Sequence, residues 1–376
     1  MDGGSGVTRH TDMRRSGDCL ALVTAEAASL APLAAVIDQD GQYPAERMAR
    51  LGAAGAFGLH LADHTRLARP SLAAAIEAMA IVSAECMSTG FCIWCQDSAA
   101  WYLEQTANAS LRARLQPGIA AGQVMAGTGL SNPVKALSGS ESFRLRGQRV
   151  AGGYMVSGIL PWVSNLGEGH WMGTVFELAG APEHRVMAML KIGQDGISIR
   201  RNARFIALEG TATYSVLVRR AFIPDEHILA DPAEEIMPRI QPGFIMLQTG
   251  MGLGVIDAAA RLMHEADKVQ GHANTHLPLR AAQVEERAHT LRARLASLAA
   301  TPADSALAMR KEVLRLRLDV SETCLEATQA ALLHWGAAGY LEGSPLHRRL
   351  REAWFVAIIT PSIRHLRQWL ARLEEG

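Results

Sequence analysis

The sequence predicts an α+β protein in which a helical segment, a β segment and a second helical segment follow one another. Apolar residues recur at helical spacing over residues 19–121 and again from residue 240 onward. Between these two regions, short β-branched segments are separated by glycines, which is the pattern of strands. The chain has 376 residues, enough for two or three packed subdomains around a large core.

Charge and cysteine content exclude several classes of function. Lys plus Arg and Asp plus Glu both number 37, so the net charge is zero and favours neither nucleic acid nor an anionic membrane as partner. The five cysteines are few for this length, which indicates reduced thiols and a cytoplasmic location. Cys92 and Cys95 form a C-x-x-C pair without a second pair. A zinc site needs more ligands, so we expect core cysteines and no metal.

Two stretches bear on targeting. Residues 1–18 contain Gly and Arg and have no apolar region of the secretory kind, so we expect a disordered leader. The apolar run Leu72–Cys95 is interrupted by Glu77 and Glu85. Charges inside a bilayer are costly. The run is therefore interpreted as a buried helix pair rather than a membrane span.

The first segment is predicted to be almost entirely helical. Pro32 is expected to kink or split its first helix, and Pro44 to begin the next one, because proline suits the first position of a helix. The predicted helices are Cys19–Asp38, Ala45–Gly55, Ser71–Met87, Gly90–Gln105 and Ser110–Ala121.

The middle segment is predicted to be a set of short strands. Apolar and polar residues alternate from Arg144 to Gly158 around Gly152 and Gly153, which is a β-hairpin signal. The predicted strands are Gln123–Gly129, Ser142–Val150, Tyr154–Ile159, Trp171–Leu178, Arg185–Ile192, Ile197–Ala203 and Ala212–Phe222. Helices then return, and are predicted over residues 243–270, 279–299, 303–338 and 346–373.

The hairpin ties together two polar-aromatic segments, Gly127–Pro133 and Leu160–Asn165. They supply backbone amides, the hydroxyls of Ser131 and Ser164, and the flat indole of Trp162. Such a surface suits a planar cofactor rich in heteroatoms. The alternative is a structural hairpin whose Trp162 fills core.

These segments resemble the middle domain of the acyl-CoA dehydrogenase family, where a T-E-P-x-x-G-S-D loop, a hairpin and a W-[IV]-[ST]-N segment follow one another. Ser131–Pro133 stands where Thr-Glu-Pro stands, and Trp162–Asn165 matches the second motif closely, whereas Gly139–Ser142 departs from G-S-D. The resemblance runs from about Leu22 to Leu373. It implies an N-terminal helical domain (19–121), a middle β-barrel domain (122–238) and a C-terminal four-helix bundle (239–376).

The resemblance implies an FAD cofactor, with FMN or an externally reduced flavin as alternatives. Gly336–Tyr340 resembles G-G-x-G-[YF], which in the family approaches the adenosine half of an FAD bound by the neighbouring subunit. The alternative there is a helix end with Gly at C′. His272 occupies the position of the Arg in the family's R-x-x-F-G motif. A histidine cannot bind phosphate in bidentate fashion as an arginine does, so the implied affinity for FAD is lower. The implied cofactor-binding residues are Leu130, Ser131, Trp162, Val163, Ser164, Gly336, Gly339 and Ser362.

The catalytic carboxylate of the family is missing from its implied position. Arg351–Ala353 resembles R-D-A, and the family's Glu, nine residues after the Arg, corresponds to Thr360. The alternative acid position, near Phe244, holds no acid either. Desaturation needs a base within hydrogen-bond reach, so we expect it to be very slow. Asp97 is a candidate base because its apolar setting raises the pKa of a carboxylate, the alternative being a surface or capping acid.

The substrate pocket is implied to contain Trp94, Gln96 and Phe244, while His334 and His365 are interpreted as structural. Three functions follow. The first is a flavin-dependent oxidoreductase acting on an acyl thioester, carried on CoA or a carrier protein. The second is a flavin monooxygenase on the same fold, which needs no Glu. The third is an acyl-binding scaffold without redox chemistry. Apolar positions in 279–299 and 303–338 further predict a homodimer or homotetramer.

Overall fold

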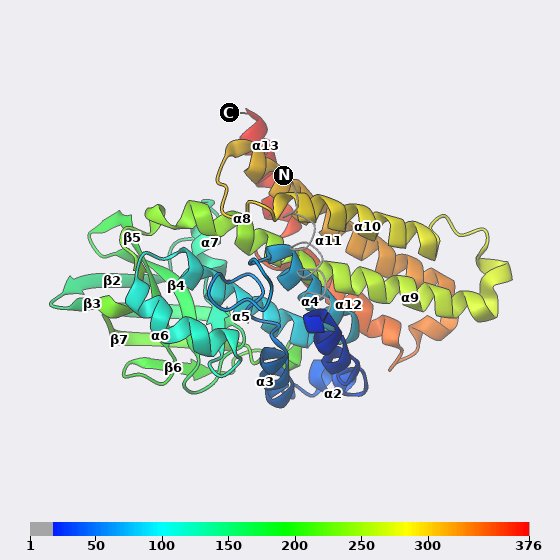
Figure 1. The fold of residues 1–376 in the computed structure, drawn as a ribbon, viewed down its shortest axis with the longest axis horizontal. Coiled ribbons are helices and arrows are strands. Elements are labelled where there is room, and N and C mark those ends of the chain that lie inside the picture. The colour runs from blue at the N-terminus through cyan, green and yellow to red at the C-terminus, as the bar shows by residue number, and fades with distance from the viewer. Residues whose placement is uncertain (1–17, 376) are drawn as a thin grey trace, which may run out of the picture.

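The computed structural model describes residues 18–375, and the three segments appear in the predicted order (Figure 1). The sheet occupies one end of the molecule and the long helices of the bundle the other, with α5 between them (Figure 1). The predicted leader lies outside the described residues except for Asp18, which begins the first helix.

The N-terminal segment is helical, as predicted. A helix over residues 18–28 is followed by η1 (Ala31–Leu33) and α2 (Ala34–Gln39), so the predicted split at Pro32 is confirmed. The proline lacks the N–H that a continuing helix would need. Every residue of α5 from Met87 to Leu103 is buried, which makes this helix the centre of the molecule. The remaining helices are α3 (Ala45–Ala54), α4 (Leu72–Glu85), α5 (Met87–Gln105) and α6 (Ala109–Ala120).

The middle segment forms one sheet in the order β6-β7-β3-β2-β4-β5-β8, with β1 paired to β4. The predicted hairpin is confirmed: Val150 lies opposite Gly153, and Gly152 takes a φ of +76°, which glycine adopts without strain. The helix α7 and the strand β8 were not predicted, and neither were the short 3-10 helices η2 (Glu209–Thr211), η3 (Asp225–His227) and η4 (Ala233–Glu235). The bounds are β1 (Ala126–Thr128), α7 (Ser131–Leu137), β2 (Leu145–Val150), β3 (Gly153–Val163), β4 (Trp171–Leu178), β5 (Ala181–Lys191), β6 (Ile197–Arg200), β7 (Tyr214–Pro224) and β8 (Ile228–Ala230).

The sheet curls around a hydrophobic core of its own. Leu145 of β2, Leu190 of β5 and Val216 of β7 belong to one buried cluster, separate from the larger core of the helices. Strands from both halves of the sheet contribute to this cluster, so the sheet wraps around it. This is the barrel-like middle domain that the sequence predicts.

The C-terminal segment is a bundle in which α9 packs against α10, α11 and α12. The prediction of one helix over 346–373 is wrong, because the chain breaks between α12 and α13 at residues 359–362, where Pro361 cannot continue a helix. The predicted helix 243–270 is likewise two helices that meet at Gln248. The bounds are α8 (Met237–Leu247), α9 (Thr249–Asn274), α10 (Ala281–Leu298), α11 (Leu307–Trp335), η5 (Gly336–Tyr340), α12 (Pro345–Ile358) and α13 (Ile363–Glu375).

A buried ion-pair network ties α12 to the end of α4. Glu352 is fully buried and accepts hydrogen bonds from Arg348 at 2.9 Å and from Arg349 at 2.7 Å. Arg349 also donates to the carbonyls of Ser83 and Ala84, which the last turn of α4 leaves without helical partners. The network therefore fixes the start of α12, the helix that leads to Thr360.

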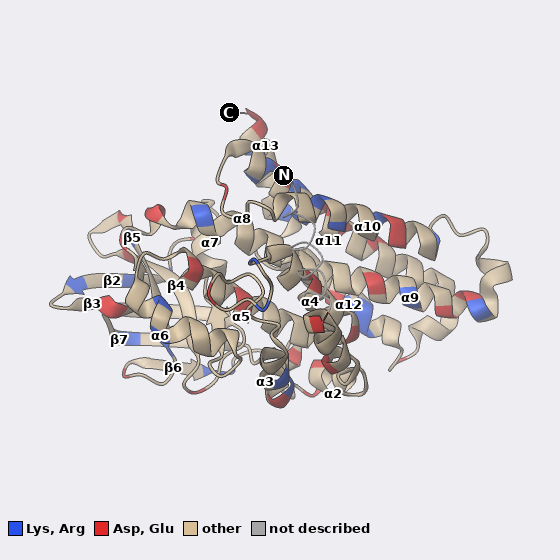
Figure 2. Ribbon diagram, in the orientation of Figure 1, with Lys and Arg blue, Asp and Glu red and all other residues tan. Residues whose placement is uncertain are grey.

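Two stretches, Asp18–Gln39 and Met237–Asn274, are long and apolar enough to cross a membrane by length and composition alone. The apolar window of the second is 94% buried inside the protein, as expected of a core helix, and that of the first is 28% buried. Acidic and basic residues are interspersed along the ribbon in Figure 2. The absence of a membrane partner stays a prediction.

Candidate functional site

A cavity of about 1020 Å³ lies where α5, α7, α8, α12, the start of α13, the end of β3 and the β6–β7 loop meet. We call it the main cavity. Its size is at the upper end of the usual range for ligand sites. It brings together residues that are far apart in the sequence, from Phe91 to His365.

One wall of the main cavity carries the predicted ring-binding residues. Trp162, Ser164 and Ser131 all line it, together with Thr128. The Trp162 side chain is 56% exposed and meets the edge of Phe205, with ring centroids 6.4 Å apart. The predicted position of Trp162 beside a cleft is therefore confirmed, while its contact with a flavin stays a prediction.

The deep side of the main cavity is aromatic. Phe91 stacks on Trp94 with ring centroids 5.5 Å apart, and Trp94 contacts Phe244 at 5.2 Å. Phe355 of α12 completes this aromatic group, with its ring centroid 4.8 Å from that of Phe91. The Trp94 indole N–H is buried without a hydrogen-bond partner in the described part of the chain. Trp94 and Phe244 thus line an apolar part of the main cavity, and their implied contact with a substrate stays a prediction.

Thr360 is held at the cavity wall by its backbone. Its carbonyl accepts a hydrogen bond from Gln248 Nε2 at 2.8 Å, and Gln248 Oε1 accepts one from Arg317 Nε at 3.0 Å. Burial lowers the pKa of Arg317 to about 10, so this guanidinium stays charged at neutral pH. The Thr360 hydroxyl lies 3.1 Å from that of Ser131. This arrangement fixes the segment between α12 and α13 beside the predicted ring-binding wall.

No carboxylate lines the main cavity among residues 18–375. The missing acid at Thr360 is therefore not replaced by another acid from elsewhere in the described fold. An acidic side chain would not fit at Gly243, the alternative position, because a Cβ there would lie 2.5 Å from the Trp101 ring. A hydroxyl such as Thr360 is too weak a base for proton abstraction without activation.

His365 presents a hydrogen-bond donor at the start of α13. Its Nδ1 accepts from the Ser362 backbone N–H at 3.2 Å and lies 2.9 Å from the Ser362 hydroxyl. A backbone N–H can only donate, so the ring proton is on Nε2. Burial, together with the nearby Arg364 and Lys135, lowers the pKa of His365. Nε2 is buried without a partner among the described residues.

Two predicted site residues on α5 point away from the main cavity. The side-chain amide of Gln96 stabilises the start of β1: its Nε2 donates to the carbonyls of Ile119 and Val124, and its Oε1 accepts from the Ala126 N–H. Gln96 does not line the main cavity, so its assignment to the substrate pocket is wrong. Asp97 is fully buried and does not line the cavity. Burial raises the pKa of Asp97 well above its usual range. As a base for a ligand in this cavity, Asp97 is excluded.

The other predicted residues lie outside the main cavity. The Val163 side chain is in the core of the sheet, and Leu130 lines a separate crevice of about 300 Å³ that Phe244 also borders. Gly336 and Gly339 lie in η5, at the end of the bundle away from the sheet (Figure 1). Their implied contact with a neighbouring subunit's cofactor stays a prediction.

His334 bonds Asp267 and the Leu279 carbonyl, both at 2.9 Å, as expected of a structural histidine. The two C-x-x-C cysteines are free and buried, as predicted. Within residues 18–375 no group of three or more His, Cys, Asp or Glu side chains could hold a metal ion.

Sequence reasoning missed the wall formed by the loop between β6 and β7. Ala203–Leu208 lines the main cavity, and so do Trp354 and Arg364 from the C-terminal helices. Arg351 joins the two sides by donating to the Ile206 carbonyl. No local pattern in the sequence marks this loop, because its place depends on that long-range contact.

The comparisons with known proteins agree with this architecture. The acyl-CoA dehydrogenase N-terminal domain family matches residues 23–123. The chain is 24% identical over 342 residues to a probable acyl-CoA dehydrogenase of Mycobacterium leprae, with 86% of each chain covered. It is 24% identical over 338 residues to the benzylmalonyl-CoA dehydrogenase of Aromatoleum aromaticum, which covers 88% of this chain and 89% of that one.

Solved structures share the whole fold. The butyryl-CoA dehydrogenase of Megasphaera elsdenii has a TM-score of 0.86 at 15% identity, covering 100% of both chains. The dibenzothiophene monooxygenase of a Paenibacillus species has a TM-score of 0.78 at 12% identity, covering 96% of both chains. The fold is therefore that of the acyl-CoA dehydrogenase-like flavoproteins. The chain itself is similar to acyl-CoA dehydrogenases over 86–88% of its length, and residues 23–123 match their N-terminal domain.

Proposed function

We propose that the chain is a flavin-dependent oxidoreductase that binds the flavin ring against Trp162, Ser131 and Ser164. The observation that supports this proposal is the main cavity of about 1020 Å³, which is lined by the exposed Trp162 indole, by several Ser and Thr residues and by an aromatic floor. A flavin has a planar ring with several polar atoms, which the hydroxyl side chains that line the cavity could contact. When bound, the flavin supplies two-electron redox chemistry.

The proposed substrate is a small acyl compound, carried on CoA or on a carrier protein. Phe91, Trp94, Phe244 and Phe355 give the main cavity an apolar floor that would bury an acyl chain. The named relatives include two acyl-CoA dehydrogenases, which supports a thioester. Thr360 would face the substrate at the position where members of the family carry their catalytic base.

A flavin monooxygenase is the second candidate, and one observation favours it. Desaturation requires a group that removes a proton from carbon, and no carboxylate lines the main cavity within residues 18–375. Oxygenation by a reduced flavin and O2 does not require such a base. The dibenzothiophene monooxygenase structure has the same fold, which supports this candidate without deciding it.

An anaerobic titration of the purified protein tests the proposed function. Added flavin should bind saturably with a shifted absorbance band, and Ser164→Ala should weaken binding several-fold, because a net hydrogen bond contributes about 1 kcal/mol. Bleaching on addition of a short acyl-CoA would identify a dehydrogenase. Bleaching only by an external reductant, followed by substrate oxygenation in air, would identify a monooxygenase. A protein that binds acyl-CoA but no flavin would instead be the scaffold without redox chemistry.

We also propose a homodimer or homotetramer in the cytoplasm. Leu333, Tyr340 and Leu341, at the end of α11 and in the segment after it, are exposed apolar residues that a partner subunit could cover. Sedimentation at micromolar concentration should give a mass at least twice 40.4 kDa. A single species of the mass of one chain would contradict the proposed assembly.

A further inference from the structure

The main cavity is rich in aromatic side chains. Seven of the 28 residues that line it are Phe or Trp, whereas aromatic residues make up 5% of the chain. The proposed flavin ring lies against one of them, Trp162, on the exposed side. Four others are linked by ring contacts on the deep side, and we call them the deep aromatic group: Phe91, Trp94, Phe244 and Phe355. Because Trp162 is not a member of this group, the group is available to a second ring.

The rings of the deep aromatic group are fixed by packing. Phe91 is 6% exposed, and Trp94 and Phe244 are each 4% exposed. Phe244 is backed by Tyr102, with ring centroids 6.3 Å apart. The planes of Phe91 and Trp94 are inclined by only 11°, whereas Phe355 meets Phe91 at 66°. The group therefore presents rings in settled orientations, and a ligand does not have to order these side chains when it binds.

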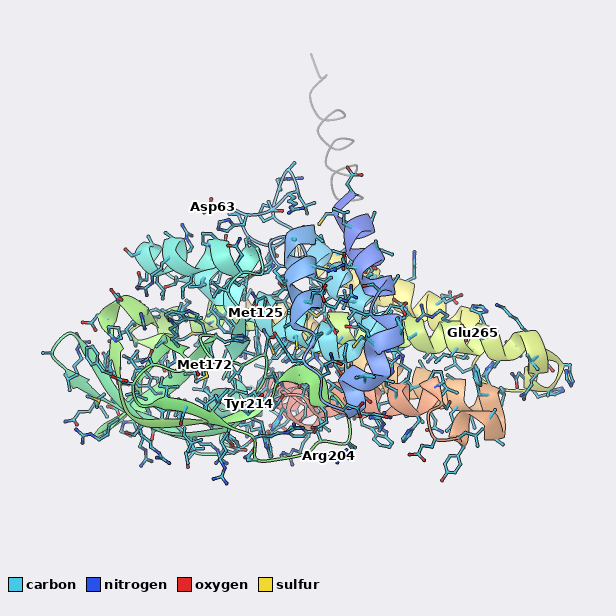
Figure 3. All side chains as sticks on the ribbon, turned by 90° about the horizontal axis from the view of Figure 1, so that it is seen from below. Asp63, Met125, Met172, Arg204, Tyr214 and Glu265 are labelled. Atoms are coloured by element: carbon cyan, nitrogen blue, oxygen red, sulfur yellow. The ribbon has the colours of Figure 1, made fainter. Side chains whose placement is uncertain are left out.

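The deep aromatic group adjoins the segment that carries Thr360. Phe355 stands in the last turn of α12, directly before that segment, and both line the main cavity. The β6–β7 loop also lines the cavity, and Figure 3 shows Arg204 on this loop, beside the C-terminal helices. A ligand whose ring lies in the deep aromatic group thus shares one cavity with Thr360 and with the proposed flavin wall.

We propose that the deep aromatic group binds an aromatic ring of the substrate, so that the substrate is an aryl-bearing compound rather than a linear acyl chain. The inference rests on the proposed function and narrows its substrate class. A stacked or edge-to-face ring pair strengthens binding by roughly two- to tenfold beyond the burial of apolar area. A saturated ring with the same number of carbons has at least as much apolar surface, so burial alone would not favour the aromatic ring. A preference for the aromatic ring therefore reports the ring contacts themselves.

The test compares three CoA thioesters whose acyl groups have the same number of carbons: phenylacetyl-CoA, cyclohexylacetyl-CoA and octanoyl-CoA. Each is titrated by calorimetry into the full-length protein after flavin has been added. Phenylacetyl-CoA should bind roughly tenfold more tightly than either of the others, because its ring meets more than one ring of the group. The pair 2-naphthol and decahydro-2-naphthol repeats the comparison without a thioester. If the aromatic member binds no more tightly than its saturated counterpart in both pairs, the inference is overturned.

Phe91→Leu and Phe355→Leu remove rings from the deep aromatic group and keep apolar side chains. Each should lower the preference for phenylacetyl-CoA over cyclohexylacetyl-CoA by roughly two- to tenfold. Phe222→Leu is the matched control, because Phe222 lies on β7, is 43% exposed and does not line the main cavity. It should keep the wild-type preference. Phe91→Met and Phe355→Met replace a leucine variant that fails to fold, since Met fills irregular gaps in a core.

Flavin binding, measured on the same samples, separates this inference from the proposed function. An unchanged preference in variants at both Phe91 and Phe355 would overturn the assignment of the deep aromatic group. If flavin still binds, that result leaves the proposed function intact. A wild type that binds no flavin would overturn both the proposed function and the description of the aromatic ligand as its substrate.

Discussion

Replacing Thr360 with Glu is expected to raise acyl-CoA desaturation by roughly 10²–10⁴-fold, the usual contribution of a positioned general base. Thr360 lines the main cavity beside Ser131, and its carbonyl is held by Gln248 at 2.8 Å. The new carboxylate would therefore face the cavity from a fixed backbone. Arg364 and Lys135 also line the cavity, and their positive charge favours the ionised, basic form of the carboxylate. The measurement is the rate of enoyl-CoA formation with an artificial electron acceptor and bound flavin.

Thr360→Gln is the matched control, because it has the size of Glu without its charge. It should leave desaturation at the low wild-type level. If Thr360→Glu binds flavin and thioester but stays inactive, the dehydrogenase assignment is weakened and the monooxygenase or the scaffold is favoured. Strong wild-type desaturation that survives both Thr360→Val and Asp97→Asn would show that a base lies elsewhere.

Glu352→Ala is expected to lower the free energy of unfolding by about 3–5 kcal/mol, the typical cost of removing one partner of a buried ion pair. Glu352 is fully buried between Arg348 and Arg349, and Arg349 is only 2% exposed. Without the carboxylate, two neighbouring guanidinium groups would remain inside the protein with only carbonyls as acceptors. Urea denaturation at neutral pH, followed by circular dichroism, measures the change.

Glu326→Ala removes an acid from a comparable but exposed pair, in which Glu326 bonds Arg287 at 2.6 Å. Pairs of this kind contribute about 0–1 kcal/mol because water screens them. The two variants therefore separate the effect of burial from the effect of charge. A loss below about 1 kcal/mol in Glu352→Ala would mean that water or a displaced Arg349 side chain compensates for the missing carboxylate.

Local patterns predicted most elements because each depends on neighbouring residues. The β2–β3 hairpin needs only alternation and a glycine at the turn, and Gly152 supplies the positive φ. The break between α12 and α13 was missed although Pro361 marks it, because apolar residues keep a helical period on both sides. Strand β8 was missed because its three residues are too short for a period of two to be recognised.

The orientation of α5 could not be predicted from its sequence. A helix that is buried on all sides has no polar face, so periodicity does not indicate which residues face a cavity. Trp94 faces the main cavity, whereas Gln96 and Asp97 do not, and all three are buried. The resemblance placed this helix correctly, but only packing decided which side chains reach the ligand.

The sequence by itself determined the order of the three segments, the hairpin that carries Trp162 and Ser164, and the absence of an acid at Thr360. Only the tertiary structure decided what surrounds them. Arg204 and Arg364 share one cavity because Arg351 holds the β6–β7 loop against α12, a contact between residues far apart in the chain. The charge of a cavity is the sum over all the elements that enclose it, and local periodicity carries no information about which elements those are.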